Sequence, residues 1–241
     1  MNNKLIAAVT GLIIGNLALL NAEETIKSWS WNTEAGYVQT TGNSKSESAN
    51  ANTNYQKKWT KTLLTVKGTH LSAKQDNSQS AESYSASEKG DLSVSRRFYV
   101  YELVGWGKDR FAGIDHRYNG QAGLGYKILD TKIDQLDSEL GADYTTEEYL
   151  SGIDNDFASA RGYLKYNRTL SDTSQVTQEL EVLKNLEDGD DLRNTSISAL
   201  SVSINTNLAL KLSYTVKYDR EPTPGFKKTD TILATALILK L

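Results

Sequence analysis

Residues 207–241 decide the fold, and they read NLALKLSYTVKYDREPTPGFKKTDTILATALILKL. From residue 208 to residue 218, leucine, tyrosine and valine occupy every second position, with lysine, serine, threonine and alanine between them. A period of two sends alternate side chains to opposite faces of a β-strand, so this strand has one apolar and one polar face. Its length, about eleven residues, is what a tilted strand needs to cross a bilayer.

A polar segment, residues 219–228, interrupts the alternation and holds both prolines of the chain, Pro222 and Pro224. Proline cannot donate to a sheet ladder, so this segment is a connection. A second apolar strand follows over residues 231–241. Such a strand needs a partner on its free side, and closure of the sheet into a barrel supplies one.

The composition narrows the class of protein. The chain has 241 residues, 24% of them charged, with a net charge of −3 and a mean hydropathy of −0.50. These values exclude a helical membrane protein, and no basic run indicates nucleic acid binding. Cysteine is absent, which excludes disulfides and thiolate metal sites. The length suits one all-β barrel.

The N-terminus has the layout of a secretory signal. Lys4 precedes an apolar run over residues 5–20, and Ala22 offers a small residue for cleavage before two glutamates. We expect a signal peptide over residues 1–22, with a barrel over residues 23–241. An uncleaved membrane anchor is the alternative.

From residue 28 onwards the pattern predicts twelve strands and no helix of any length. The connections after strands two, four, six, eight and ten are short, and those after strands three, seven and eleven are longer and more polar. Short turns at one end and longer loops at the other, with an even strand count, are typical of an outer-membrane barrel. The predicted fold class is therefore all-β: a single antiparallel up-and-down transmembrane β-barrel of about twelve strands.

Several strands fit a lipid-facing wall poorly. The second, over residues 47–56, has hardly an aliphatic residue, and Glu88 and Gly90 lie in the middle of the apolar face of the fourth. An exposed charge near the bilayer midplane costs roughly 2–4 kcal/mol. Either the register shifts at a bulge or part of the barrel projects beyond the membrane. A soluble periplasmic barrel remains an alternative.

Side-chain placement follows from the same alternation. With about twelve strands the interior is modest, and we expect Glu102, Glu139, Arg161 and Lys211 to point inward and fill much of it. Aromatic residues are expected to form girdles at the membrane surfaces. The candidates are Trp29, Trp31, Tyr37, Tyr99, Tyr101, Tyr118 and Tyr126.

Four stretches carry a resemblance to a known family. They are TGNS at residues 41–44 with Ser46, Ser48 and Asn50, KDRFAGIDHR at 108–117, LSDT at 170–173 leading to Gln178 and Glu179, and YDREPTPGFKKTDT at 218–231. Together they resemble the salt-induced outer-membrane protein family of Gram-negative bacteria, the YdiY-like group, a domain of unknown function. The resemblance covers residues 31–241 and implies an outer-membrane β-barrel without assigned catalytic residues. The chain departs from outer-membrane barrels in ending on Leu241, where the assembly machinery commonly finds an aromatic ring.

Two charged clusters are candidate binding sites. Asp109, Arg110, Asp115 and Arg117 lie within nine residues at one hairpin tip and could select ions in a lumen, or could lock the loop through arginine–carboxylate pairs. Lys227 and Lys228 could contact lipopolysaccharide phosphates from a loop on the same side, or could simply be solvated. The acidic run at residues 188–191 lacks the fuller pattern of a calcium-binding loop, and we expect no metal or other cofactor.

For catalysis the chain offers little. His70 and Ser72 are neighbours on one strand face, but nucleophilic catalysis needs a base within reach and a third group that orients it. We expect no enzymatic activity. The sequence therefore predicts a monomeric outer-membrane barrel, structural or with a narrow pore, with outer-membrane lipid, lipopolysaccharide and the barrel assembly machinery as partners. A barrel-type lipid hydrolase, or a soluble periplasmic protein that binds a small apolar ligand, are the alternatives.

Overall fold

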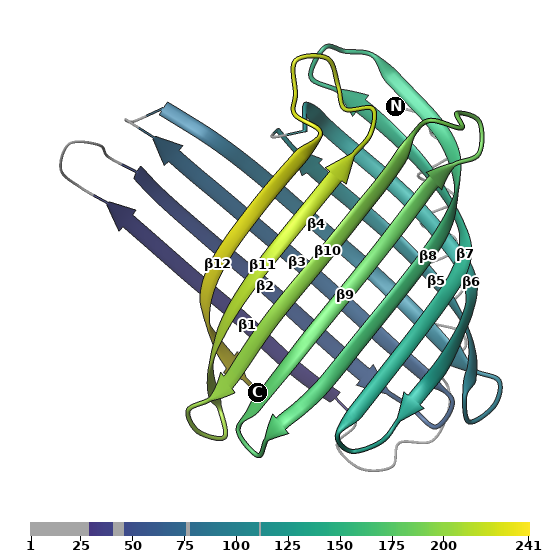
Figure 1. The fold of residues 1–241 in the computed structure, drawn as a ribbon, viewed down its shortest axis with the longest axis vertical. Helices are drawn as coiled ribbons and strands as arrows, with labels where there is room; N and C mark the ends of the chain where they lie inside the picture. The colour runs from purple at the N-terminus through teal and green to yellow at the C-terminus, as the bar shows by residue number, and fades with distance from the viewer. Residues whose placement is uncertain (1–28, 41–45, 76–77, 111) are drawn as a thin grey trace.

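The computed structural model describes residues 29–40, 46–75, 78–110 and 112–241. They form a closed barrel of twelve antiparallel strands, each paired with its neighbours in sequence, with β1 and β12 closing the ring (Figure 1). The strands are β1 Trp29–Thr40, β2 Ser46–Lys58, β3 Thr62–Gln75, β4 Ser78–Ser93, β5 Phe98–Asp109, β6 Ile114–Asp130, β7 Asp134–Tyr149, β8 Asp154–Ser171, β9 Ser174–Asn185, β10 Leu192–Ser203, β11 Leu208–Asp219 and β12 Thr229–Lys240. In this part of the chain no helix is long and apolar enough to cross a membrane. The predicted fold class is confirmed.

The predicted signal peptide, residues 1–22, lies outside the described residues, as does the TGNS stretch at residues 41–44. The turn end of the barrel carries the short connections that follow the even-numbered strands, together with the start of β1 and the end of β12. The loop end carries the others. The longest of them joins β11 to β12 and is visible at the top of Figure 1.

Two loops are shorter than the sequence predicts. The connections after β3 and β7 were expected to be long, yet β4 already begins at Ser78 and β7 continues to Tyr149. The expectation was wrong because cross-strand pairing extends both hairpins. A register shift at Ala73/Lys74 accommodates the first, and Glu147 and Glu148 pair with β8 in the second.

The wall has a polar inner face and an apolar outer face. On β7, for example, Leu140 is 73% exposed while its neighbour Glu139 is 3% exposed. On β11 and β12, Leu210, Leu233 and Leu237 are exposed on the outside. A soluble protein buries aliphatic side chains and exposes carboxylates, so this reversed polarity matches a barrel whose solvent outside is lipid.

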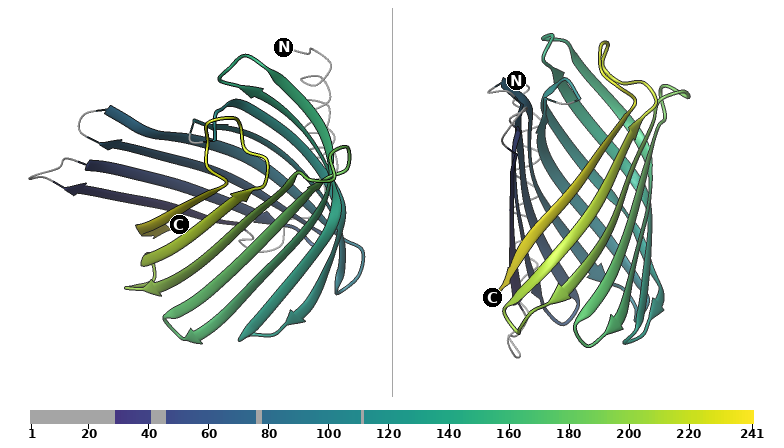
Figure 2. Two further views of the ribbon diagram at one scale, coloured as in Figure 1. Left: turned by 45° about the horizontal axis from the view of Figure 1, so that its top comes forward. Right: turned by 60° about the vertical axis from the view of Figure 1, so that its left-hand side comes forward.

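The closing seam between β1 and β12 is short. Residues 32–35 of β1 pair with residues 237–240 of β12, whereas β1 pairs with β2 along its whole length. Figures 1 and 2 show the loop-side ends of β1 to β4 splayed away from β11 and β12. Strands β1 and β12 therefore close the ring only near its turn end.

The face of β5 that the sequence analysis placed on the outside of the barrel points into the lumen. Tyr99 and Tyr101 are 7% and 3% exposed, whereas Phe98 and Val100 are exposed. Glu102 shares the outer face with Phe98 and Val100, so both the inward position of Glu102 and the girdle positions of the two tyrosines were wrong. Both faces of β5 carry large apolar residues, so its alternation alone does not say which faces the lumen. Glu139, Arg161 and Lys211 do point inward.

Glycines on neighbouring strands fix this orientation of β5. A Cβ at Gly125 would lie 2.0 Å from the Tyr99 ring, and one at Gly123 would lie 2.8 Å from the Tyr101 ring. A Cβ at Gly141 would lie 2.4 Å from the Tyr101 hydroxyl. The two rings therefore lie flat against the inner wall over positions that carry no side chain, a form of the aromatic cover of glycine known from β-sheets.

A bulge does not explain why Glu88 and Gly90 lie in the middle of the lipid-facing side of β4. The ladder between β4 and β5 runs from residue 83 to residue 93 without a register shift. Glu88 pairs across it with Val104, and Gly90 pairs with Glu102. The carboxylates of Glu88 and Glu102 therefore both belong to the outer face of the barrel.

Candidate functional site: the charged lumen

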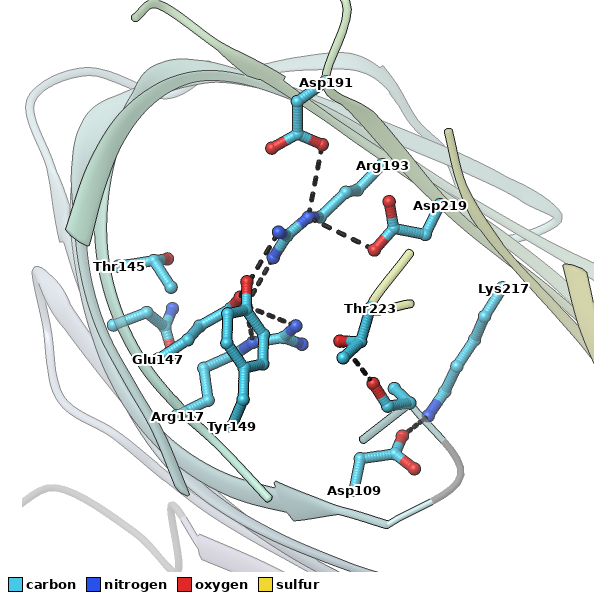
Figure 3. Close-up of polar contacts among 12 residues, drawn as sticks. Asp109, Arg117, Thr145, Glu147, Tyr149, Asp191, Arg193, Lys217, Asp219 and Thr223 are labelled. Atoms are coloured by element: carbon cyan, nitrogen blue, oxygen red, sulfur yellow. Dashed lines mark hydrogen bonds and ion pairs between the residues drawn. The ribbon is translucent and has the colours of Figure 1, made fainter. Parts of the chain in front are cut away.

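The loop end of the lumen is crossed by a group that we call the mouth cluster: Arg117, Glu147, Asp191, Arg193 and Asp219. Glu147, fully buried on β7, accepts hydrogen bonds from Nε of Arg117 at 2.6 Å and from Nη1 of Arg193. Nε of Arg193 lies 3.5 Å from both Asp191 and Asp219. Figure 3 shows these side chains meeting inside the ring of strands, so β6, β7, β10 and β11 are joined across the mouth.

Neutral groups complete the mouth cluster. The Tyr149 hydroxyl donates to Glu147 at 2.8 Å, and the Arg193 guanidinium lies 4.6 Å from the centre of the Phe157 ring. Every oxygen of Glu147 is therefore engaged. A buried carboxylate needs such a full set of partners, because an unpaired one carries a large desolvation cost.

A second bridge closes the mouth beside this cluster. Lys217 on β11 binds Asp109 on β5 at 2.7 Å, and the Thr223 hydroxyl donates to the Ala112 carbonyl at 3.0 Å (Figure 3). Gly113 has φ +74°, and a Cβ on it would lie 2.6 Å from the Phe226 ring. The loop between β11 and β12 therefore packs on the turn between β5 and β6. This contact brings together two of the four stretches that carry the family resemblance, residues 108–117 and 218–231.

Halfway down the lumen lies a second group, the central cluster: Lys89, Asp91, Glu139, Arg161 and Glu181. Glu139 binds Nζ of Lys89 at 2.6 Å and Nη1 of Arg161 at 2.8 Å. Lys89 also binds Asp91 at 2.7 Å, and Arg161 also binds Glu181 at 2.6 Å. These ion pairs link β4, β7, β8 and β9 across the inside of the barrel.

The two inward tyrosines of β5 extend the central cluster. The Tyr99 hydroxyl donates to Glu139 at 2.9 Å, and Arg161 donates to the Tyr101 hydroxyl at 3.0 Å. Further ion pairs line the rest of the wall, with Lys211 bound to Glu34 at 2.9 Å and Lys165 bound to Glu179 at 3.0 Å. The lumen charges named here are thus neutralised in pairs of opposite sign, and side chains held in this way can narrow the space inside a barrel.

The four residues of the predicted hairpin cluster separate in the structure. Asp109 and Arg117 point into the lumen, where they bind Lys217 and Glu147. Arg110 binds Glu82 at 3.2 Å, and Asp115 binds Lys108 at 2.5 Å. Each charge therefore has a partner outside the cluster. Lys227 and Lys228 are exposed in the loop between β11 and β12.

The hub residues Glu147 and Arg193 were missed by the sequence analysis. The longer connection predicted after the seventh strand begins at Glu147, which removes this residue from the inner face of a strand. The signal was present, because Asp143, Thr145, Glu147 and Tyr149 continue one polar face in steps of two. Arg193 gave no comparable signal, since its partner lies 46 residues away in sequence.

His70 and Ser72 gain no catalytic geometry. The His70 ring stacks on Tyr84 with centroids 4.6 Å apart, and its Nδ1 is buried without a hydrogen bond. A nucleophile–base pair requires a third group that orients the base, and among the described residues none binds this nitrogen.

Three exposed carboxylates gather at the loop end. Oxygens of Asp188, Asp190 and Glu221 lie within 4.8 Å of one another. The negative charge of Asp188 is the main cause that raises the pKa of Glu221 above its ordinary value. The repulsion between Asp188 and Glu221, which lie in two different loops, is therefore relieved when Glu221 is protonated. It returns as the pH rises through the pKa of Glu221.

Replacing Asp188 by asparagine is expected to lower the pKa of Glu221 toward the ordinary glutamate value, about 4.3. Side-chain NMR of ¹³C-labelled glutamate, with E221Q used to assign the resonance, measures this shift. D172N, at the turn end of the barrel, is the control and should leave the titration unchanged. An equal titration in D188N and the parent chain would show that the two loops do not meet.

Valine at position 113 is expected to release the loop between β11 and β12, because its side chain would occupy the place of the Phe226 ring. Limited trypsin cleavage after Lys227 or Lys228 should then be faster in G113V than in the parent protein. G152V is the matched control, because Gly152 also has a positive φ, +77°, yet a Cβ there meets nothing within 4 Å. If both variants are cleaved alike, the faster cleavage comes from the strain that valine introduces at a positive φ, and the Phe226 contact does not hold the loop.

Solved barrels resemble this fold. The translocator domain of the autotransporter NalP from Neisseria meningitidis matches with a TM-score of 0.51 and 12% identity, over 98% of this chain and 96% of that one. The NanC porin matches with a TM-score of 0.50 and 9% identity, over 87% and 97%. At these identities the likeness concerns the fold alone, and these neighbours are a translocator and a porin rather than enzymes.

Sequence comparison places the chain in a family. The uncharacterized protein YdiY of Escherichia coli (strain K12) is 27% identical over 198 residues, which cover 81% of this chain and 76% of that protein. A family model described as "Protein of unknown function, DUF481" matches residues 33–240, nearly the whole described barrel. The chain therefore belongs to the DUF481 family of proteins of unknown function.

Proposed function

We propose that this protein is an outer-membrane barrel whose lumen forms a narrow, charge-lined pore. The observation that carries the proposal is the reversed polarity of the wall. Aliphatic side chains such as Leu140 and Leu233 are exposed outside, and the charges of Glu139, Glu147 and Arg161 are buried inside. An outward apolar face needs lipid, and an inward polar face needs water or ion pairs.

The pore is narrow because the mouth and central clusters cross the lumen at two levels. Ions passing through must move between paired carboxylates and guanidiniums, which favours small hydrated ions over larger solutes. Twelve strands enclose more room than the eight-stranded barrels that side chains fill, and less than the sixteen-stranded porins with open aqueous channels.

Planar-bilayer recording tests the pore. The purified barrel should give small, uniform conductance steps in concentrated potassium chloride, and a sixteen-stranded porin in the same bilayer should give far larger ones. Absence of steps from a protein that is demonstrably inserted would leave a structural role and overturn the pore.

The setting of the pore follows from the same proposal. The chain would be exported by the signal peptide at residues 1–22, be folded by the barrel assembly machinery and act as a monomer. Lys227 and Lys228, exposed at the loop end, are suited to lipopolysaccharide phosphates. A role in salt or osmotic stress rests on the family resemblance and is tested by growth of a deletion strain at high salt.

A further inference from the structure

The ladder between β1 and β12 stops at Ala35 and Leu237, although both strands continue towards the loop end. Beyond these residues each strand still pairs with its other neighbour, β2 or β11. The facing edges, residues 36–40 of β1 and 229–236 of β12, share no ladder in the part of the chain that the structure describes. We call these two edges the open seam. An open edge is costly in lipid, because its backbone groups find no water there to bind.

The register of the existing ladder would continue across the open seam. Trp31 and Leu241 exchange both of their backbone hydrogen bonds, and such rungs recur at every second residue of an antiparallel pair. In this register the last rung of a closed seam would join residue 39 to residue 233. The seam can therefore close without a register shift, which would turn the side chains of either strand to the other face.

Contacts on the far side of the mouth hold β12 away from β1. Lys217, which lies opposite β12 on β11, binds Asp109 of β5 at 2.7 Å. Beyond it, Phe226 packs on Gly113 between β5 and β6. The loop ends of β11 and β12 are thus tied to the opposite wall, and Figure 2 shows β1 and β2 leading away from them.

Gly36 marks the point at which β1 and β12 part. A Cβ on it would overlap the Thr235 carbonyl oxygen and the Asn50 side chain, so only glycine allows this close approach. One step towards the turn end, Glu34 of β1 binds Lys211 of β11 at 2.9 Å. This ion pair crosses β12 on the lumen side. The seam is therefore fixed on the turn side of Gly36 and unpaired on the loop side.

Strand β12 is apolar on both faces beside the open seam. Its outer face carries the exposed residues Leu233 and Leu237. Its inner face carries Ile232, Ala234 and Ala236 at alternate positions. An apolar stripe on a lumen wall gains nothing from water, whereas an alkyl chain covering it removes apolar surface from water. The stripe therefore selects an occupant with an apolar chain.

Polar groups lie on the lumen side of the same seam. Asn50 is opposite Gly36 in the ladder between β1 and β2, and Asn52 is opposite Glu34, to which it donates at 3.1 Å. Glu34 and Lys211 neutralise each other. A head group at this place meets amides and a closed ion pair, so an uncharged, hydrogen-bonding head group fits better than an ion.

The occupant must satisfy the apolar stripe as well as the strand edges. A strand from a second copy of the chain could pair with the edges, but it would leave Ile232 and Ala234 facing water. A single-chain amphiphile covers the stripe with its alkyl chain and keeps its head group among the amides of the lumen. Its departure lets the two edges pair with each other.

We propose that the open seam is a lateral gate through which a single-chain amphiphile with an uncharged head group passes between the lumen and the lipid. The head group lies by Asn50 and Asn52, and the chain runs along Ile232 and Ala234 to the outside. Pairing of β1 with β12 up to residue 39 closes the gate. The proposal rests on the membrane placement in the proposed function, but it does not require the lumen to conduct ions.

The test closes the gate with a disulfide. The chain has no cysteine, so Q39C/L233C supplies the only thiols. In a closed seam the Cα atoms of these two residues would be about 5.5 Å apart, which suits a disulfide. T33C/L239C is the matched control, because this pair belongs to the same kind of rung in the ladder that already exists.

A photo-crosslinker reports whether an alkyl chain enters the lumen. The folded full-length barrel is placed in phosphatidylcholine vesicles with an alkyne-tagged monoacylglycerol, and p-benzoylphenylalanine is introduced at position 213 or 214. Position 213 faces the lumen opposite Ala234, and position 214 faces lipid. Capture at position 213 should be lost when Q39C/L233C is oxidised and should return on reduction. Capture at position 214, and both captures in T33C/L239C, should not change.

The contacts that hold the gate open are tested by the rate of disulfide formation. K217M removes the ion pair with Asp109, so Q39C/L233C should form its disulfide faster in this background. K132M removes an exposed lysine at the turn end and is the control. An equal rate in both backgrounds would show that Lys217 does not hold the gate open.

Other outcomes would overturn the proposal. Equal capture at position 213 before and after oxidation of Q39C/L233C would show that the chain does not pass through the seam. Capture at position 214 alone would show that it never enters the lumen, and failure of Q39C/L233C to form a disulfide where T33C/L239C does would show that the gate has no closed state. Disulfide-linked dimers of L233C would assign the seam to a second copy. The heat-dependent gel mobility of each variant keeps a failed gate distinct from a failed barrel.

Discussion

Replacing Glu147 by glutamine is expected to lower the free energy of unfolding by about 3 kcal/mol. Removal of one partner from a buried ion pair leaves the other charge uncompensated, which typically costs about 3–5 kcal/mol. The lower figure applies because the Arg117 side chain keeps 34% of its exposure, while Arg193 keeps 15% and Glu147 none. Glutamine preserves the size of the side chain, so the loss reports charge rather than volume.

Urea unfolding of the barrel in lipid vesicles measures this change. Glu148→Gln is the matched control, because Glu148 is the adjacent residue, is exposed, and points to the opposite face of β7. E148Q should unfold within about 0.5 kcal/mol of the parent protein, as surface substitutions usually do. Equal losses in E147Q and E148Q would mean that Glu147 is not the hub of the mouth cluster.

Replacing Arg193 by alanine is expected to widen the mouth and change its ion preference. Without the guanidinium, the carboxylates of Glu147, Asp191 and Asp219 face the lumen with only Arg117 to balance them. A ring of carboxylates favours cations. Single-channel conductance should therefore rise severalfold, and the reversal potential in a salt gradient should move towards that of the cation.

Arg220→Ala is the control for this second experiment, because Arg220 lies at the same end of the barrel but is exposed outside the lumen network. Its conductance and selectivity should match those of the parent protein. Gel mobility confirms that each variant remains folded before recording. An unchanged reversal potential in R193A would show that the mouth cluster does not lie on the path of ions.

The sequence predicts the barrel well where one face of a strand is clearly apolar. The alternation in β11 and β12 sends Leu210, Leu233 and Leu237 outward, as the structure has them. It fails on β5, where Tyr99, Tyr101, Phe98 and Val100 make both faces apolar. There the orientation is set by glycines on β6 and β7, whose relation to β5 depends on register and not on local sequence.

The candidate site was predictable only in part. That Asp109 and Arg117 carry charge at a hairpin tip is evident from the sequence, but their partners Lys217 and Glu147 come from strands distant along the chain. Pairing across a closed barrel depends on strand tilt and stagger, which local alternation does not encode. The outward position of Glu88, in contrast, followed correctly from alternation alone and contradicted only the expectation of a uniformly apolar wall.

The most direct test of a membrane-spanning barrel is electrophoretic mobility of the membrane-extracted protein with and without boiling, after fractionation of the cells. A closed transmembrane barrel stays folded in detergent until it is heated. We expect the protein in the outer-membrane fraction, with the unboiled sample migrating faster than the boiled one. Recovery in the soluble periplasmic fraction, with identical mobility before and after boiling, would contradict the account.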